Sequence, residues 1–262
     1  MRAIPKIIFQ TWKTRTGIPE SYLQWRHSII RHNPSYRHAL WGDRENRSFI
    51  KKLYPWFLPI FDGYEHNIMR ADVIRYFFLY HFGGIYIDLD TECLRPLDSY
   101  LERGNVVLGR MGVDPEFSQS IPNAVMMSAP RQEFWLFVFH LLVERAKRDI
   151  RPEYKTGPDI LKSSIEIYND SSAYKSTRES IHRLLADNGI DMRANRTAKI
   201  HVAPARDFYP IDWSDPIHQY FIRRKVVRDG VLFSDDEKRE LFPHSALVSY
   251  WTHGWEPERW PE

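Results

Sequence analysis

The stretch from residue 68 to residue 90 constrains the fold more than any other part of the chain. Apolar residues recur through 68–80 with the spacing of a helix, and Gly83 and Gly84 follow where a helix commonly ends. Residues 85–87 are β-branched or aromatic and predict a short buried strand. Because strands that alternate with helices are typical of layered α/β proteins, we expect an α/β fold.

The rest of the chain continues this alternation and shows no internal repeat or linker. The predicted strands lie at 6–11 and 38–41, and the predicted helices lie at 20–32, 45–53 and 134–143. Residues from about 150 to 190 have a polar helical pattern, and the C-terminal stretch is expected to be irregular and rich in tryptophan. A chain of 262 residues with this organisation is expected to form a single domain.

Composition excludes several classes of protein. The hydrophobic fraction of 43% is too high for a disordered chain, and the net charge of +3 is too small to suggest nucleic acid as a partner. Pro5 and Lys6 interrupt the apolar stretch that a signal peptide needs, and no run reaches the ~18 apolar residues of a membrane helix. We therefore expect a cytoplasmic protein. A basic run at 223–228 is interpreted as a solvated face, with peripheral contact to acidic lipid headgroups as the open alternative.

Two aspartates follow the predicted strand at 85–87. If strand geometry continues through them, Asp88 and Asp90 point the same way while Leu89 points into the core. Two carboxylates at the carboxyl end of a strand suit a divalent ion with oxygen ligands, such as Mg²⁺ or Mn²⁺. An Asp-x-Asp pair alone is a weak signal, but burying two unpaired like charges is costly, so a cation is expected to balance them.

Asp72 and Arg75 stand three residues apart in the predicted helix at 68–80 and therefore share a face. They have two interpretations. One is a surface ion pair, which contributes little. The other is a charged pair that faces a polar ligand beside the metal. We favour the second, because the pair interrupts an otherwise apolar helix just before the Asp-x-Asp segment.

These segments resemble a known family. Residues 70–76, 79–80 and 83–90 closely resemble the core signature of glycosyltransferases with an Asp-x-Asp (DXD) sugar-binding region. That group contains fungal initiating α-1,6-mannosyltransferases and inositol-phosphoceramide mannosyltransferases, and it is distantly related to the clostridial glucosylating toxins. Residues 4–12, 41–43 and 156–158 carry further matches, so the clear resemblance covers roughly residues 4–98.

The resemblance implies a GT-A-type, Rossmann-like nucleotide-sugar-binding domain with added helices. The implied reaction is the retaining transfer of a hexose, such as mannose, from a GDP- or UDP-sugar to a glycan or glycolipid acceptor, with Mn²⁺ or Mg²⁺ as cofactor. One catalytic domain would occupy residues 1–262, with its donor-binding core at about 4–130. A helical and C-terminal part at about 131–262 would serve the acceptor and close the site.

The resemblance also implies roles for individual residues. Asp88 and Asp90 would hold the metal, and Trp12 would stack on the base. The catalytic candidates are Asp72, Arg75 and Asp88. The expected donor-binding residues are Gln10, Trp12, Asp72, Arg75, Tyr86, Asp88, Asn123, His253 and Trp255. The family pattern has a serine before its C-terminal tryptophan, and this chain has His253-Gly254-Trp255 in that neighbourhood, so His253, Trp255 or a water is expected at the diphosphate.

Two other functions stay open on the sequence alone. A metal-dependent hydrolase of nucleotide sugars would use water as the acceptor, and its donor cleavage would not be diverted by any added acceptor. A catalytically idle, carbohydrate-binding relative would bind donor or glycan without turnover. The missing serine favours the idle relative, whereas the presence of Asp72, Arg75, Asp88 and Asp90 argues against it.

Overall fold

A six-stranded sheet forms the centre of the computed structural model, which describes residues 3–187, 189–194, 198–212, 215, 225–226 and 230–252. The strand order is β2-β1-β3-β6-β5-β7. The bounds are β1 (Ile7–Thr11), β2 (Arg37–Trp41), β3 (Gly84–Ile87), β5 (Val106–Gly109), β6 (Val125–Ser128) and β7 (Ile200–Ala203). Only β6 among these strands runs antiparallel to its neighbours, and the other pairings are parallel. The predicted α/β fold is confirmed.

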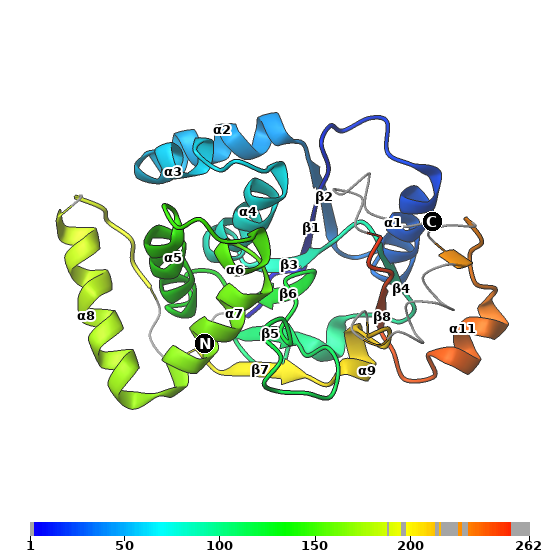
Figure 1. The fold of residues 1–262 in the computed structure, drawn as a ribbon. Coiled ribbons are helices and arrows are strands. Elements are labelled where there is room, and N and C mark those ends of the chain that lie inside the picture. Colours follow the sequence, from blue (N-terminus) through cyan, green and yellow to red (C-terminus); the bar gives the residue numbers. More distant parts are fainter. Residues whose placement is uncertain are drawn as a thin grey trace.

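Helices cover both faces of this sheet (Figure 1). The helices are α1 (Glu20–His32), α2 (Asp43–Leu53), α3 (Leu58–Asp62), α4 (Asn67–His81), α5 (Phe134–Arg145), α6 (Pro152–Lys155), α7 (Pro158–Asn169), α8 (Ser171–Asp187), α9 (Ala205–Phe208) and α11 (Asp235–Leu241), with 3₁₀ turns at Pro55–Phe57 and Asp98–Tyr100. Alternate side chains of each strand enter two different cores. Phe9 of β1 packs with the α4 and α5 side, whereas Ile8 packs with Ile29 of α1 on the other side.

Helix α4 is the most deeply buried helix around the site. Its apolar residues from Val73 to Tyr80 have essentially no exposed surface, and the ring of Phe77 stacks on Phe139 of α5 with centroids 4.2 Å apart. A helix buried on all sides cannot hydrate a polar side chain, so any charge on it needs a protein partner or a ligand. Asp72 and Arg75 lie on this helix and are themselves only 5% and 3% exposed.

The predicted helices and strands in the first 145 residues are confirmed, with their ends shifted by a residue or two. The C-terminal stretch is not irregular as expected. It contains β7, which pairs with β5, and β8 (Leu247–Ser249), which pairs antiparallel with β4 (Thr91–Cys93). Strands of three or four residues are too short for alternation to identify, so the sequence pattern missed them.

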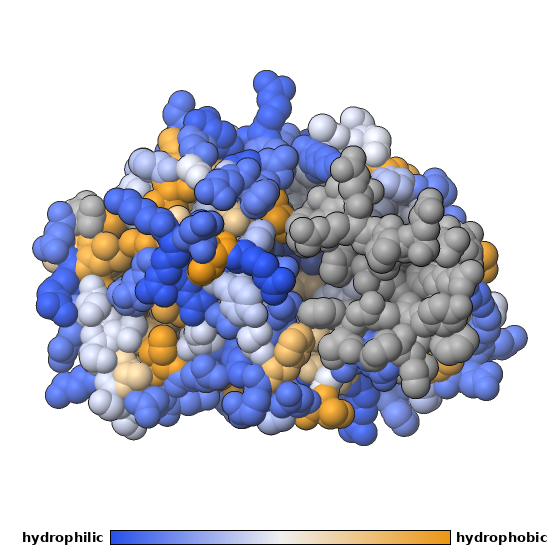
Figure 2. All heavy atoms as spheres, viewed as in Figure 1, coloured by the Kyte–Doolittle hydropathy of each residue, from blue (hydrophilic) through white to orange (hydrophobic). Residues whose placement is uncertain are grey.

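The surface seen in Figure 2 is largely hydrophilic, with apolar residues in small scattered groups. Within the part of the chain that the structure describes, none of the helices is both long enough and apolar enough to cross a membrane. The predicted cytoplasmic location stays a prediction. Of the basic run, Lys225 pairs with Glu237, while Arg223, Arg224 and Arg228 lie outside the described residues.

Gly84→Ala is expected to destabilise the fold by about 3 kcal/mol in denaturant unfolding. Gly84 has a φ of +99°, and a Cβ there would lie 2.6 Å from the backbone oxygen of Ile7 in the neighbouring strand. Gly17→Ala is the matched control, because Gly17 also has a positive φ, +71°, but a Cβ at that position would have no atom within 4 Å. The control should lose about 1 kcal/mol. Equal losses in the two variants would contradict a clash at Gly84.

Candidate active site

A cavity of about 480 Å³ lies at the carboxyl ends of β1 and β3. Its lining comes from the end of β1, the first half of α4, the turn after β3, the loop before β6, and the start of α6. This volume falls within the range of small-molecule sites, and the crevice beyond the carboxyl ends of strands is where ligands bind in open α/β sheets. The predicted residues Trp12, Asp72, Arg75, Tyr86, Asp88, Asp90 and Asn123 all line this cavity.

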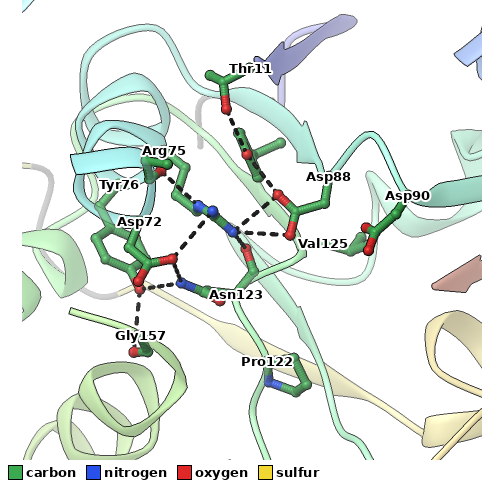
Figure 3. A network of polar contacts seen from close by, with 12 residues as sticks. Thr11, Asp72, Arg75, Tyr76, Asp88, Asp90, Pro122, Asn123, Val125 and Gly157 are labelled. Atoms are coloured by element: carbon green, nitrogen blue, oxygen red, sulfur yellow. Dashed lines mark hydrogen bonds and ion pairs between the residues drawn. The ribbon is translucent and has the colours of Figure 1, made fainter. Parts of the chain in front are cut away.

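Arg75 is the central contact of the cavity floor (Figure 3). Its Nη2 lies 3.3 Å from Oδ1 of Asp72, and its Nη1 lies 3.2 Å from both carboxylate oxygens of Asp88. Nη1 also donates to the backbone oxygen of Asn123 at 2.9 Å, and Nε donates to that of Ala71 at 3.0 Å. Burial alone would lower the pKa of Arg75, but Asp88 in particular raises it above its usual range. The guanidinium therefore stays charged and holds α4, the turn after β3 and the loop before β6 together.

Asp72 is fixed by three partners. Besides Arg75, the amide of Asn123 donates to Oδ1 at 2.9 Å, and the hydroxyl of Thr156 donates to Oδ2 at 2.9 Å. Burial raises the pKa of Asp72 to about 6, although Arg75, Asn123 and Thr156 each lower it. Of the two interpretations of the Asp72–Arg75 pair, a surface ion pair is wrong, because both side chains are less than a tenth exposed.

Tyr86 orients Asp88. Its hydroxyl donates to Oδ1 of Asp88 at 2.7 Å and accepts from the hydroxyl of Thr11 at 3.1 Å. Its ring lies under the guanidinium of Arg75, 4.6 Å from centroid to Cζ. The Asp88 side chain is 29% exposed, so one side is held by protein while the other faces the cavity.

Asp90 is held by the C-terminal part of the chain. Thr252 donates to its Oδ2 from the backbone nitrogen at 2.9 Å and from the hydroxyl at 3.0 Å, and that hydroxyl accepts from Tyr22 at 2.6 Å. Burial raises the pKa of Asp90 to about 6, and the nearby Asp88 adds to the increase. A cation bound at Asp90 would offset both the burial of its carboxylate and the repulsion from Asp88.

We predicted from strand alternation that Asp88 and Asp90 point the same way. That reasoning is wrong, because the two residues do not lie in a strand. Strand β3 ends at Ile87, and residues 88–91 form a turn closed by the Thr91 nitrogen, which donates to the oxygen of Asp88 at 3.2 Å. The turn still brings both carboxylates to the same cavity. Figure 3 shows Asp88 inside the Arg75 network and Asp90 beside it.

The residues at hand fit a cation that is shared with a phosphate ligand. Across the described residues, no three His, Cys, Asp or Glu side chains gather as a complete metal site. Magnesium-like ions are commonly held by only one or two carboxylates together with substrate phosphates and waters. Asp88 and Asp90 match that donor set, so the predicted metal site remains a prediction that the chemistry of these residues supports.

Of the two predicted residues at the end of the first strand, Trp12 lines the cavity and Gln10 does not. Trp12 lines the cavity and packs on the ring of Tyr22, with centroids 5.1 Å apart. Gln10 has no exposed surface and does not line the cavity, and its Oε1 accepts from Arg26 of α1 at 2.6 Å. Alternation does not separate the two, because residues 8, 10 and 12 would share one face, and both Gln10 and Trp12 contact α1. Trp12 lines the cavity because it follows the end of β1 at Thr11, whereas Gln10 lies inside the strand. The structure therefore does not bring Gln10 to the other predicted donor-binding residues.

His253 and Trp255, also predicted to bind the donor, lie outside the described residues. Four other residues contribute to the site without having been predicted there: Tyr22, Thr156, Trp251 and Thr252. Trp251 packs on Tyr209 and also lines the cavity. Thr156 belongs to the segment 156–158 that resembles the family, but no local pattern marks the other three, and Thr252 reaches Asp90 across 162 positions.

Comparison with known proteins identifies a family for the segment that contains Asp72, Arg75 and Asp88. Residues 19–107 match the family described as a glycosyltransferase sugar-binding region containing a DXD motif. The matched segment includes Asp72, Arg75, Asp88 and Asp90. Residues 19–107 are a DXD-containing glycosyltransferase sugar-binding region. The predicted family is thereby confirmed.

Two fungal mannosyltransferases are among the relatives of this glycosyltransferase region. Inositol phosphoceramide mannosyltransferase 2 of Schizosaccharomyces pombe is 46% identical over 144 residues, which cover 55% of this chain and 40% of that protein. The initiation-specific alpha-1,6-mannosyltransferase of Candida albicans is 31% identical over 113 residues, which cover 41% of this chain and 29% of that protein. The chain thus matches less than half the length of either relative.

Among solved structures, the PaToxG glycosyltransferase aligns with 75% of this chain and 82% of its own, at 17% identity and a TM-score of 0.49. That likeness is too low to carry the fold assignment, which rests on the strand order and pairing described above.

Arg75→Met is expected to cost about 3–5 kcal/mol at pH 8, because it leaves buried carboxylates without their cation. Removing the guanidinium raises the pKa of Asp72 further above its unfolded value of about 3.9, so the folded variant takes up a proton as pH falls. The loss relative to wild type should therefore shrink between pH 8 and pH 5, as measured by urea unfolding.

Arg47→Met is the control for this prediction. Arg47 also binds an aspartate through two nitrogens, but its partner Asp62 lies on the surface and both side chains are more than a third exposed. We expect a much smaller loss with little pH dependence. A loss for Arg75→Met that stays constant from pH 8 to pH 5 would contradict the role of the buried carboxylates.

Proposed function

We propose that the protein is a metal-dependent mannosyltransferase that moves mannose from GDP-mannose to a glycolipid or glycan acceptor, with retention of configuration. The observation that carries the proposal is the buried Asp72–Arg75–Asp88 network on the floor of a cavity that Asp90 and Trp12 also line. The choice of mannose and of these acceptors is supported by the names of the fungal relatives.

Arg75 and the two metal-site aspartates would serve the leaving group. Breaking the sugar–phosphate bond places negative charge on the nucleoside diphosphate, and a bound divalent ion supplies charge neutralisation there. Asp88 and Asp90 would hold that ion. Contacts with the described residues use the Nε–H of Arg75, both N–H groups of Nη1 and one N–H of Nη2. The second N–H of Nη2 would donate to the diphosphate of the nucleotide sugar.

Asp72 would serve the sugar. Positive charge develops at the sugar ring in glycosyl transfer, and a fixed carboxylate stabilises it. Asn123, Thr156 and Arg75 hold the Asp72 carboxylate in one orientation, so little reorganisation is needed as that charge develops. Trp12 offers a flat ring for the base at the other end of the donor, next to Tyr22.

A donor panel tests the proposed function. The protein is incubated with GDP-mannose, UDP-glucose, UDP-galactose and UDP-N-acetylglucosamine, each with Mn²⁺ or with chelator, and nucleoside diphosphate release is measured. We expect release from GDP-mannose alone, its loss in chelator, and its stimulation by an acceptor with transfer of mannose to it. Fast release that no acceptor diverts would favour the hydrolase. Donor-induced thermal stabilisation without release under any condition would favour the idle relative.

Asp90→Asn is expected to lower metal-dependent release at least ~100-fold, because a metal that neutralises a leaving group contributes several kcal/mol to catalysis. The fold should survive, since asparagine keeps an oxygen for Thr252 and removes a charge that burial and Asp88 disfavour. The thermal midpoint should be unchanged or higher.

Asp98→Asn is the matched control, because Asp98 is half exposed and pairs with Lys6 away from the cavity. We expect its release rate to stay within twofold of wild type. Unchanged activity in Asp90→Asn would contradict the assignment of Asp90 as a metal ligand.

A further inference from the structure

The cavity has a second polar wall beyond Asp72, which the proposed donor contacts do not use. The wall consists of Gln119 in the loop before β6 and of Arg151 and Glu153 at the start of α6, all of which line the cavity. Thr156 ties the end of α6 to Asp72 through its hydroxyl, so Glu153 lies one helical turn from that contact. In Figure 3, Gly157, which follows α6, lies on the Asp72 side of the network and Asp90 lies on the other side.

Glu153 has an unsatisfied carboxylate oxygen. Its Oε2 is buried and accepts no hydrogen bond from the described residues. The nearest cation is Arg151, whose Nε is 3.8 Å away, too far for a hydrogen bond. A buried acceptor without a partner costs stability, so its retention beside a cavity calls for an explanation by function.

Gln119 is a second polar side chain that lines the cavity without a hydrogen-bond partner among the described residues. The residue is only 8% exposed, yet no described residue forms a hydrogen bond with its side-chain amide, and it lines the same cavity. A buried amide offers both donors and an acceptor. A ligand group that matches an amide and a carboxylate at once is a hydroxyl, which both donates and accepts.

The backbone holds this wall in place. The Lys162 ammonium on α7 donates to the backbone oxygen of Glu116 at 2.8 Å, which joins the loop of Gln119 to the helix that follows α6. A Cβ on Gly157 would lie 3.0 Å from the Cα of Glu153, so the turn between α6 and α7 packs closely against Glu153. The two polar side chains are therefore presented from joined segments.

We propose that Gln119, Arg151 and Glu153 bind the acceptor, and that the acceptor presents a hydroxyl-bearing ring, a hexose or a cyclitol, to Gln119 and Glu153. This inference rests on the proposed function, because a donor that reaches from Trp12 to Asp72 leaves this wall open to the acceptor. The carboxylate of Glu153 disfavours an anion at the ring itself. Arg151 is 67% exposed, and it serves an anionic group further out, such as a phosphodiester next to the ring.

Titration by saturation-transfer NMR tests this subsite without requiring turnover. Methyl α-D-mannopyranoside and myo-inositol are the probes, added to the full chain in the presence of GDP and Mn²⁺. Wild type should bind at least one probe. Glu153→Gln and Gln119→Leu should each weaken that binding at least tenfold, while the dissociation constant of GDP stays within twofold. Glu144→Gln is the matched control, because Glu144 is 47% exposed on α5 and does not line the cavity, and it should change neither constant.

Three results would overturn the inference: wild type binds neither probe, Glu153→Gln binds the probe as wild type does, or Glu153→Gln weakens GDP as much as the probe. The last result would make Glu153 a donor residue. Failure of the proposed function has a different signature, which is the absence of release or transfer in the donor panel whatever the probe affinities are. A thermal midpoint for each variant within a few degrees of wild type shows that the fold is intact.

Discussion

The buried guanidinium of Arg75 is the interaction on which the rest of the site depends. A cation that is 3% exposed inside an apolar helix loses its hydration, and only close anionic and carbonyl partners offset that cost. Its partners are Asp72, Asp88 and the backbone oxygens of Ala71 and Asn123. They come from three segments, so satisfying one charge positions a helix, a turn and a loop relative to one another.

Asp72, Asp88 and Asp90, three of the four aspartates that line the cavity, differ because their surroundings differ. Asp88 faces the guanidinium directly and keeps part of its surface in the cavity. Asp72 and Asp90 are the two whose pKa burial raises to about 6. Asp72 is held by protein donors on every side, whereas Asp90 is held mainly by Thr252 and lies close to Asp88. These differences suit Asp72 to the sugar, and Asp88 and Asp90 to a cation that they share.

Much of this site could be predicted from the sequence. Residues 70–90 form a continuous local unit in which helix, glycine turn and strand follow one another, and the spacing of Asp72 and Arg75 places them on one face whatever surrounds them. Gln10 does not join the other predicted residues because it is fully buried inside β1, where Arg26 of α1 donates to it, and the packing of a helix on a strand is decided by the tertiary structure. Asp88 and Asp90 do lie in one cavity, as predicted, but a turn that begins at Asp88 brings them together, and strand alternation does not.

The sequence by itself determines an α/β layer, a helix face that carries Asp72 and Arg75, and an Asp-x-Asp segment after β3, since these follow from periodicity and spacing over a few residues. Which groups complete the cavity depends on contacts between distant segments. Thr156 reaches Asp72 across 84 positions and Thr252 reaches Asp90 across 162, and no local pattern encodes such pairs. The unsatisfied Oε2 of Glu153 and the position of Gln119 in the same cavity are likewise visible only in the folded chain, because burial and neighbours are properties of packing.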